Sequence, residues 1–188
     1  MKRLLLILIL TFTFQILTKA DDIRDFQIEG ISIGDSLLDL MSEKEINKKS
    51  TDKFFYKNNE YYYHYFPSLN FLKTYDALQL TFKNNDPNYI IYSLQGVIRP
   101  INMNECFSKI KNIKNELNIL FNKNAKFDQG NHSFFKSSTY ERYYYNLDSG
   151  YVEIVCYDMS EKSKKTDSLY VIVDNKNFTK FLKEVQYK

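Results

Sequence analysis

The stretch Met103–Phe121, MNECFSKIKNIKNELNILF, decides how the chain folds. Its apolar residues recur at spacings of three and four, the pattern of an amphipathic helix with one buried face. They are Met103, Cys106, Phe107, Ile110, Ile113, Leu117, Leu120 and Phe121. Asn102 precedes the stretch and Glu105 follows three residues later, which is a helix-capping signature. The sequence therefore predicts a central helix over residues 103–121.

Strand-forming segments rich in aromatic residues flank this helix on both sides. Alternating and apolar runs predict two hairpins and three further strands. The hairpins cover residues 53–66 and 140–159, the second turning at Asp148-Ser149-Gly150, and the single strands cover 75–83, 89–98 and 169–173. Residues 128–132 are typical of a turn, and Phe134–Lys136 are predicted to begin another strand.

Short elements complete the predicted fold at both ends. Asp35 or Ser36 can cap one short helix and Ser42 a second, which predicts a helical pair ending near Lys49. Asn175 can cap a final amphipathic helix. We therefore expect an α+β single domain over residues 21–188. Its antiparallel sheet of about six or seven strands should pack against the central helix, the C-terminal helix and the N-terminal helical pair.

The first 20 residues have the organisation of a secretory signal peptide. Met1-Lys2-Arg3 precede an apolar run over 4–17, and Thr18-Lys19-Ala20 precede Asp21-Asp22. The run is shorter than the roughly 20 residues that span a bilayer, so cleavage before Asp21 is preferred over an uncleaved anchor. We expect a periplasmic or secreted protein with no transmembrane segment after cleavage.

The net charge of the chain lies in this leader. Lys2, Arg3 and Lys19 belong to it, which leaves 23 of the 26 basic residues to balance the 23 acidic ones. The mature chain is formally neutral, so its composition argues against a nucleic-acid partner.

Several segments together resemble a known group of proteins. They are Phe26–Ser36, Ser93–Ile98, Asn104-Glu105-Cys106, Cys156–Glu161 and Phe178–Tyr187. This combination resembles a group of short secreted bacterial proteins of unassigned function, which implies one domain, export and paired use of Cys106 and Cys156. Residues 31–36 also resemble the strand-to-helix entry of small envelope proteins of the BamE and β-lactamase-inhibitor type.

Motifs for catalysis or metal binding are scarce. The chain has two histidines, His64 and His132, and no Gly-Xaa-Ser-Xaa-Gly elbow. We interpret His64 as a cross-strand or surface residue and His132 as a surface residue. Histidines and cysteines this widely spaced do not form a zinc motif, and five scattered glycines do not form a phosphate loop. We therefore expect no catalytic residues, no metal and no cofactor.

Aromatic side chains supply the one candidate contact surface. Tyr61, Tyr63 and Tyr65 lie on one face of a predicted strand, where their rings could stack on a glycan or contact a protein. An AT-rich coding bias that places tyrosine on an ordinary sheet surface is the alternative, because tyrosine is also a good strand former.

The two cysteines, Cys106 and Cys156, are expected to form a disulfide. Export permits the bond, and Cys106 lies on the apolar stripe of the central helix, facing whatever that helix packs against. Two buried free thiols are the alternative.

These observations favour an exported, non-catalytic binding or interaction protein of the bacterial envelope. An enzyme of unrecognised type and an accessory to envelope assembly are the alternatives. A cleft that places a histidine beside a carboxylate would favour the enzyme.

Overall fold

An eight-stranded antiparallel sheet dominates the computed structural model, which describes residues 22–188. Its strand order is β3-β4-β5-β6-β10-β9-β8-β7. The strands are β3 (Asp52–Phe55), β4 (Tyr61–Pro67), β5 (Ala77–Lys83), β6 (Ile91–Ile98), β7 (Lys126–Asn131), β8 (Thr139–Asn146), β9 (Gly150–Asp158) and β10 (Ser168–Asn175). Short strands β1 (Gln27–Ile28) and β2 (Ile31–Ser32) form a separate pair.

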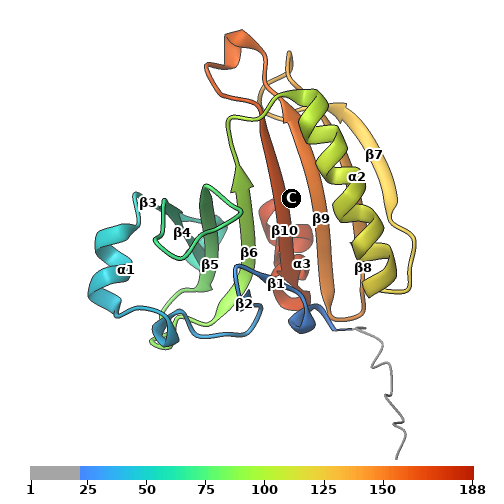
Figure 1. Cartoon of the computed structure of the whole chain (residues 1–188). Helices are drawn as coiled ribbons and strands as arrows, with labels where there is room; N and C mark the ends of the chain where they lie inside the picture. Colours follow the sequence, from blue (N-terminus) through green and yellow to red (C-terminus); the bar gives the residue numbers. More distant parts are fainter. Residues whose placement is uncertain (1–21) are drawn as a thin grey trace, which may run out of the picture.

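Two helices lie on opposite faces of the large sheet (Figure 1). Helix α2 (Met103–Leu120) packs on β8, β9 and β10, and α3 (Lys176–Phe181) with the π-helical turn η5 (Leu182–Gln186) packs behind β6, β9 and β10. We call the α2 side the closed face and the α3 side the cavity face. Because side chains alternate along a strand, each strand contributes to both.

The predicted central helix is confirmed, with Phe121 as its C-cap. The Asn102 side chain accepts a hydrogen bond from the Glu105 amide at 2.9 Å, as the capping signature indicates. On the strand side, the Tyr145 hydroxyl donates to Asn118 Oδ1 at 2.8 Å. Polar contacts therefore fix both ends of the helix, in addition to the packing of its buried face.

The predicted Cys106–Cys156 disulfide is also confirmed. It joins the first turn of α2 to β9, and the two Cα atoms are 6.0 Å apart. Both cysteines are fully buried in the core of the closed face. The bond therefore ties the helix to the middle of the sheet.

The N-terminal segment covers the remainder of the closed face. Ile28, Ile31, Leu37 and Ile46 are buried in the same cluster as Leu80 of β5. The predicted helical pair is correct only for its second member, α1 (Glu43–Lys49), where Ser42 and Glu45 form a capping box. The first member is only the three-residue 3₁₀ turn η2 (Leu37–Asp39), whose first residue, Leu37, is already fully buried in the core.

The sheet has more strands than predicted, and one predicted strand is wrong. Residues 128–132 were expected to turn, yet Asp128 lies within β7, while Phe134–Lys136 lie in a loop. Strand β7 is an edge strand with mostly exposed residues, so it lacks the apolar alternation that marks a half-buried strand. Backbone pairing with β8 holds it in the sheet.

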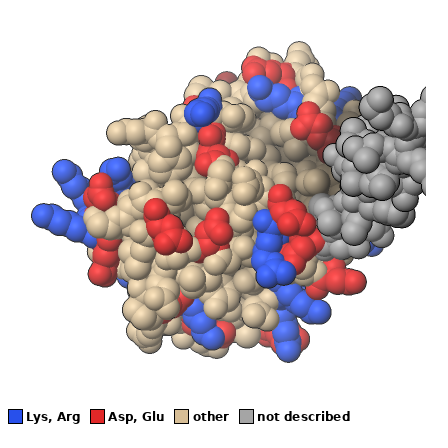
Figure 2. Space-filling view, turned by 60° about the horizontal axis from the view of Figure 1, so that its bottom comes forward, with Lys and Arg blue, Asp and Glu red and all other residues tan. Residues whose placement is uncertain are grey.

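The remaining short helical turns are η1 (Ile23–Asp25), η3 (Lys57–Asn59) and η4 (Glu161–Ser163). Lysine, arginine and acidic side chains are interspersed on the visible described face in Figure 2, which shows no extended patch of one sign there. No helix within residues 22–188 combines the length and the apolar character needed to cross a bilayer. The predicted leader, 1–20, and its cleavage before Asp21 lie outside the described residues.

Candidate functional site

A cavity of about 1100 Å³ lies on the cavity face, in the part of the sheet that α3 leaves uncovered. Its floor is formed by β6, β8, β9 and β10, and its walls by η5 and by the loops that contain His132 and Lys165. Ligand cavities in proteins commonly have volumes of about 300–1,000 Å³, so this one is large enough for a small organic molecule.

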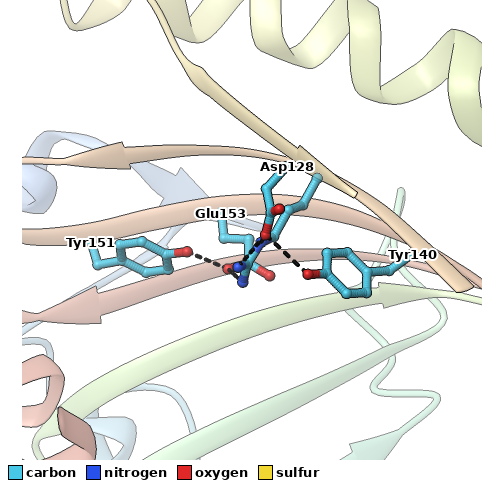
Figure 3. A network of polar contacts seen from close by, with 5 residues as sticks. Asp128, Tyr140, Tyr151 and Glu153 are labelled. Carbon is cyan, nitrogen blue, oxygen red and sulfur yellow. Dashed lines mark hydrogen bonds and ion pairs between the residues drawn. The ribbon is translucent and has the colours of Figure 1, made fainter. Parts of the chain in front are cut away.

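Arg142 organises the polar centre of the floor (Figure 3). Its Nη2 and Nε atoms donate to Asp128 Oδ2 at 2.6 and 2.9 Å, and its Nη1 donates to Glu153 Oε2 at 3.3 Å. The Tyr140 hydroxyl donates to Asp128 Oδ2 at 3.0 Å, and the Tyr151 hydroxyl donates to Glu153. Figure 3 shows the two tyrosines approaching from opposite sides, so the guanidinium is held in one orientation.

Strand register explains why these residues meet. Arg142 on β8 lies opposite Asp128 on β7, and Tyr140 is two residues away on the same face. Tyr151 and Glu153 are likewise two residues apart on β9. Burial raises the pKa of the Glu153 carboxyl, and the Tyr151 hydroxyl and the Arg142 charge oppose that rise.

Asp174 lies at the α3 end of the floor and differs from these carboxylates. It is 5% exposed, and its Oδ1 atom has no hydrogen-bond partner among the described residues. Burial raises the pKa of Asp174 from 3.8 to about 7, with the Ser93 hydroxyl opposing and the Glu153 charge reinforcing the rise. Buried polar groups are normally paired, so this carboxyl is exceptional.

Aromatic rings line much of the cavity. At the α3 end, Tyr56 contacts Phe178 edge-to-face with ring centroids 5.2 Å apart. Across the floor, Tyr157 of β9 and Tyr170 of β10 make a second edge-to-face contact at 5.6 Å. The lining therefore offers apolar area with hydroxyl tips, which suits ligands that are partly polar.

The three predicted contact residues all lie on the cavity face, but they differ in exposure. Tyr61 is 3% exposed because it packs against Phe178 and Phe181 of α3. Tyr63 and Tyr65 are half-buried. The Tyr65 hydroxyl accepts a hydrogen bond from Arg99, which lines the cavity. The contact role stays a prediction, and Tyr61 is not available for it.

Neither histidine forms a catalytic arrangement with a carboxylate. His64 is 2% exposed and packs among Tyr62, Phe66 and Phe82, so it is not a surface residue. It is the cross-strand residue that was the other interpretation, opposite Lys53 on β3 and Leu80 on β5. Burial, with the Lys53 charge adding, lowers the pKa of His64 to about 4.

His132 lines the cavity, where its Nδ1 accepts the Phe134 amide at 3.1 Å and the Phe135 amide at 3.3 Å. Burial lowers the pKa of His132. Within residues 22–188, no ion pair joins either histidine to a carboxylate. His132 therefore holds a loop of the wall in place.

Sequence reasoning did not find Arg142, Glu153 or Asp174 as a group. A partial signal was present in β9, where Tyr151, Glu153 and Tyr157 alternate with the apolar residues Val152, Ile154 and Cys156. Asp174 follows an apolar run and is easily interpreted as a turn residue. Only the sheet register brings it beside Ser93 and Tyr151.

Comparisons with protein-family models, with curated proteins and with solved structures find no match to this chain. Among residues 22–188, no group of three or more histidine, cysteine or acidic side chains is placed to hold a metal ion. The functional argument therefore rests on the cavity itself.

Proposed function

We propose that the chain is an exported, non-catalytic binding protein that holds a small ligand, or a side chain of a larger partner, in the cavity. The observation that carries this proposal is the cavity of about 1100 Å³ with an arranged polar floor. A few fixed polar groups within a mostly apolar lining are typical of ligand sites.

The floor is organised before any ligand arrives. Arg142 is already oriented by two carboxylates and flanked by the rings of Tyr140 and Tyr144, at 5.2 and 5.5 Å. Groups held in this way lose little conformational freedom on binding, which favours affinity. An isolated ion pair on an ordinary sheet surface would need no such support.

Export is part of the proposal and has separate support. The predicted leader supplies the signal, and a disulfide fits an oxidising compartment such as the periplasm or the cell exterior. Glycans and proteins are the partner classes that tyrosine-rich surfaces serve well.

The binding function can be tested by filling the cavity. Ile172 lies on β10 and lines the floor, so Ile172→Trp should place an indole where the ligand sits. Binding is measured by calorimetry against a panel of neutral oligosaccharides, organic amines and carboxylates. We expect at least one class to bind and Ile172→Trp to abolish that binding.

A matched control is available on the opposite side of the molecule. Ile119 on α2 is 82% exposed, so Ile119→Trp adds the same indole to solvent and should leave binding unchanged. Both variants should retain the circular dichroism spectrum of the parent. Binding that survives Ile172→Trp would contradict the proposal, and so would the absence of binding by every class in the panel.

A further inference from the structure

We propose that the α3 end of the cavity recognises an ammonium group on the ligand, with Asp174 as its counter-ion and surrounding aromatic rings as its cage. This inference rests on the proposed binding function and adds the chemical class of the ligand. A protonated amine or a quaternary ammonium attached to a partly apolar body would satisfy it.

Asp174 belongs to a row of polar residues on three neighbouring strands. In the sheet register, Thr81 of β5 faces Ser93 of β6, and Ser93 faces Asp174. Asp174 Oδ1 is buried and has no hydrogen-bond partner among the described residues. The Ser93 hydroxyl lies close enough to oppose the rise in the pKa of Asp174, and the Thr81 hydroxyl has the same effect on Tyr56. A buried carboxylate oxygen without a partner is costly unless another molecule completes it, and Asp174 lines the cavity.

The protein itself does not neutralise Asp174. Arg142 is engaged by Asp128 and Glu153, and no ion pair to Asp174 occurs within residues 22–188. Lys183 of η5 lines the cavity but makes no such pair. A buried carboxylate without a cation is unfavourable, so a cationic ligand would supply the missing charge.

Aromatic rings lie around this carboxyl on several sides. Tyr151 faces it directly from β9, and Tyr56 and Tyr187 lie close enough for its charge to raise further the pKa values that burial has already raised. Phe178 contacts Tyr56. Ammonium ions are attracted to the faces of such rings, and the attraction strengthens when water is excluded.

The pH dependence of binding should separate an ammonium ligand from a neutral one. The titratable groups near Asp174 are Glu153 and Tyr151 on β9, Tyr56 before η3, and Tyr187 near the C-terminus. Lys183 of η5 lines the same cavity. The pKa values of the three tyrosines are raised, so these remain neutral near pH 7. Ionisation of Asp174 should therefore strengthen cation binding as pH rises through about 7.

The test is a calorimetric titration of the full exported chain with choline, with butylammonium, and with the neutral dimethylbutanol in which carbon replaces the nitrogen of choline. We expect choline or butylammonium to bind at least about tenfold more tightly than dimethylbutanol. The preference should grow with pH between about 6 and 8 for the cations only.

Asp174→Asn should lower cation affinity to the level of dimethylbutanol, and Asp158→Asn, on the exposed end of β9, should change nothing. If Asp174→Asn does not fold, the pH dependence of cation binding to the parent chain tests the ammonium inference by itself. Glu153→Gln should keep the rise in cation affinity with pH but move it to lower pH, because the Glu153 charge contributes to the raised pKa of Asp174.

Two kinds of failure are distinguishable. Equal binding of cations and dimethylbutanol, abolished by Ile172→Trp, would overturn the ammonium inference and leave the binding function intact. Absence of cation binding would also overturn the inference, while other members of the panel still test the function. Cation binding that is insensitive to Ile172→Trp would place the site elsewhere and contradict both.

Discussion

The closed face and the cavity face are built from alternate residues of the same strands, and each contains a buried titratable group with at least one unpaired polar atom. On the closed face, His64 sits among aromatic rings with both ring nitrogens unpaired. On the cavity face, Asp174 lies beside about 1100 Å³ of open volume. Burial favours the neutral form of both groups.

The surroundings of the two groups give them different roles. Nothing can reach His64, so its neutral ring simply fills space between Tyr62, Phe66 and Phe82. Asp174 borders a cavity where another molecule can supply a partner. An unpaired buried polar atom therefore indicates a ligand only when a cavity adjoins it.

The largest expected effect concerns the closed face alone. Replacing both cysteines, Cys106→Ala with Cys156→Ala, opens a loop of 50 residues and should lower the free energy of unfolding by about 4 kcal/mol on the chain-entropy model. Urea unfolding measures this loss. Ligand affinity at the cavity should be unchanged in whatever fraction remains folded. Finding two titratable thiols in the unfolded, unreduced parent would contradict the bond.

A matched pair of isoleucines tests the packing of the two faces. Ile154 is fully buried on the closed face, so Ile154→Ala should cost about 2–5 kcal/mol of stability. Ile172 borders the cavity and is half-buried, so Ile172→Ala should cost less than about 2 kcal/mol. Equal losses in denaturant unfolding would mean that the cavity face is packed as tightly as the core.

Stability against pH distinguishes the two buried groups, because they act with opposite sign. The pKa of Asp174 is higher in the folded than in the unfolded state. Its contribution to stability is therefore present below about pH 3.8 and is lost as the pH rises to about 7. Asp174→Asn should remove this fall, whose limiting slope is about 1.4 kcal/mol per pH unit. An unchanged profile in thermal unfolding would indicate that the carboxyl is not buried.

His64 gives the reverse dependence. Its folded-state pKa of about 4 lies below the reference value of 6.5, so the unfolded chain takes up a proton first and stability falls as pH drops from about 6.5 to about 4. His64→Leu keeps the side-chain volume similar and removes the unpaired nitrogens. It should therefore reduce the loss of stability between about pH 6.5 and pH 4. The same thermal unfolding series measures it. If the same loss of stability at acidic pH persists in His64→Leu, other groups cause it.

Much of the fold could be predicted from the sequence, because its elements carry strong local patterns. The stripe through Cys106 and Ile110 predicted α2 and placed Cys106 on its buried face, and the turns at 57–60 and 148–150 predicted two hairpins. Strand β7 could not be predicted in this way, since Asp128 and its neighbours are polar and exposed on an edge.

The candidate site was less accessible to sequence reasoning. Its polar residues are separated along the chain and meet only through strand register, as Arg142 meets Asp128 and Asp174 meets Ser93. Tyr63 and Tyr65 were placed on a potential contact face by alternation alone, but the position of α3 determines which of these rings stay available. The exposure of these tyrosines therefore depends on tertiary packing, which sequence periodicity does not specify.

The central claim is that ligands enter the cavity face and leave the closed face untouched. The most direct measurement is methyl NMR of isoleucine-labelled protein during a choline titration, comparing Ile172 on the cavity face with Ile154 on the closed face. The account predicts a saturating shift of the Ile172 methyl signal and a stationary Ile154 signal. A stationary Ile172 signal, or equal movement of both, would contradict it.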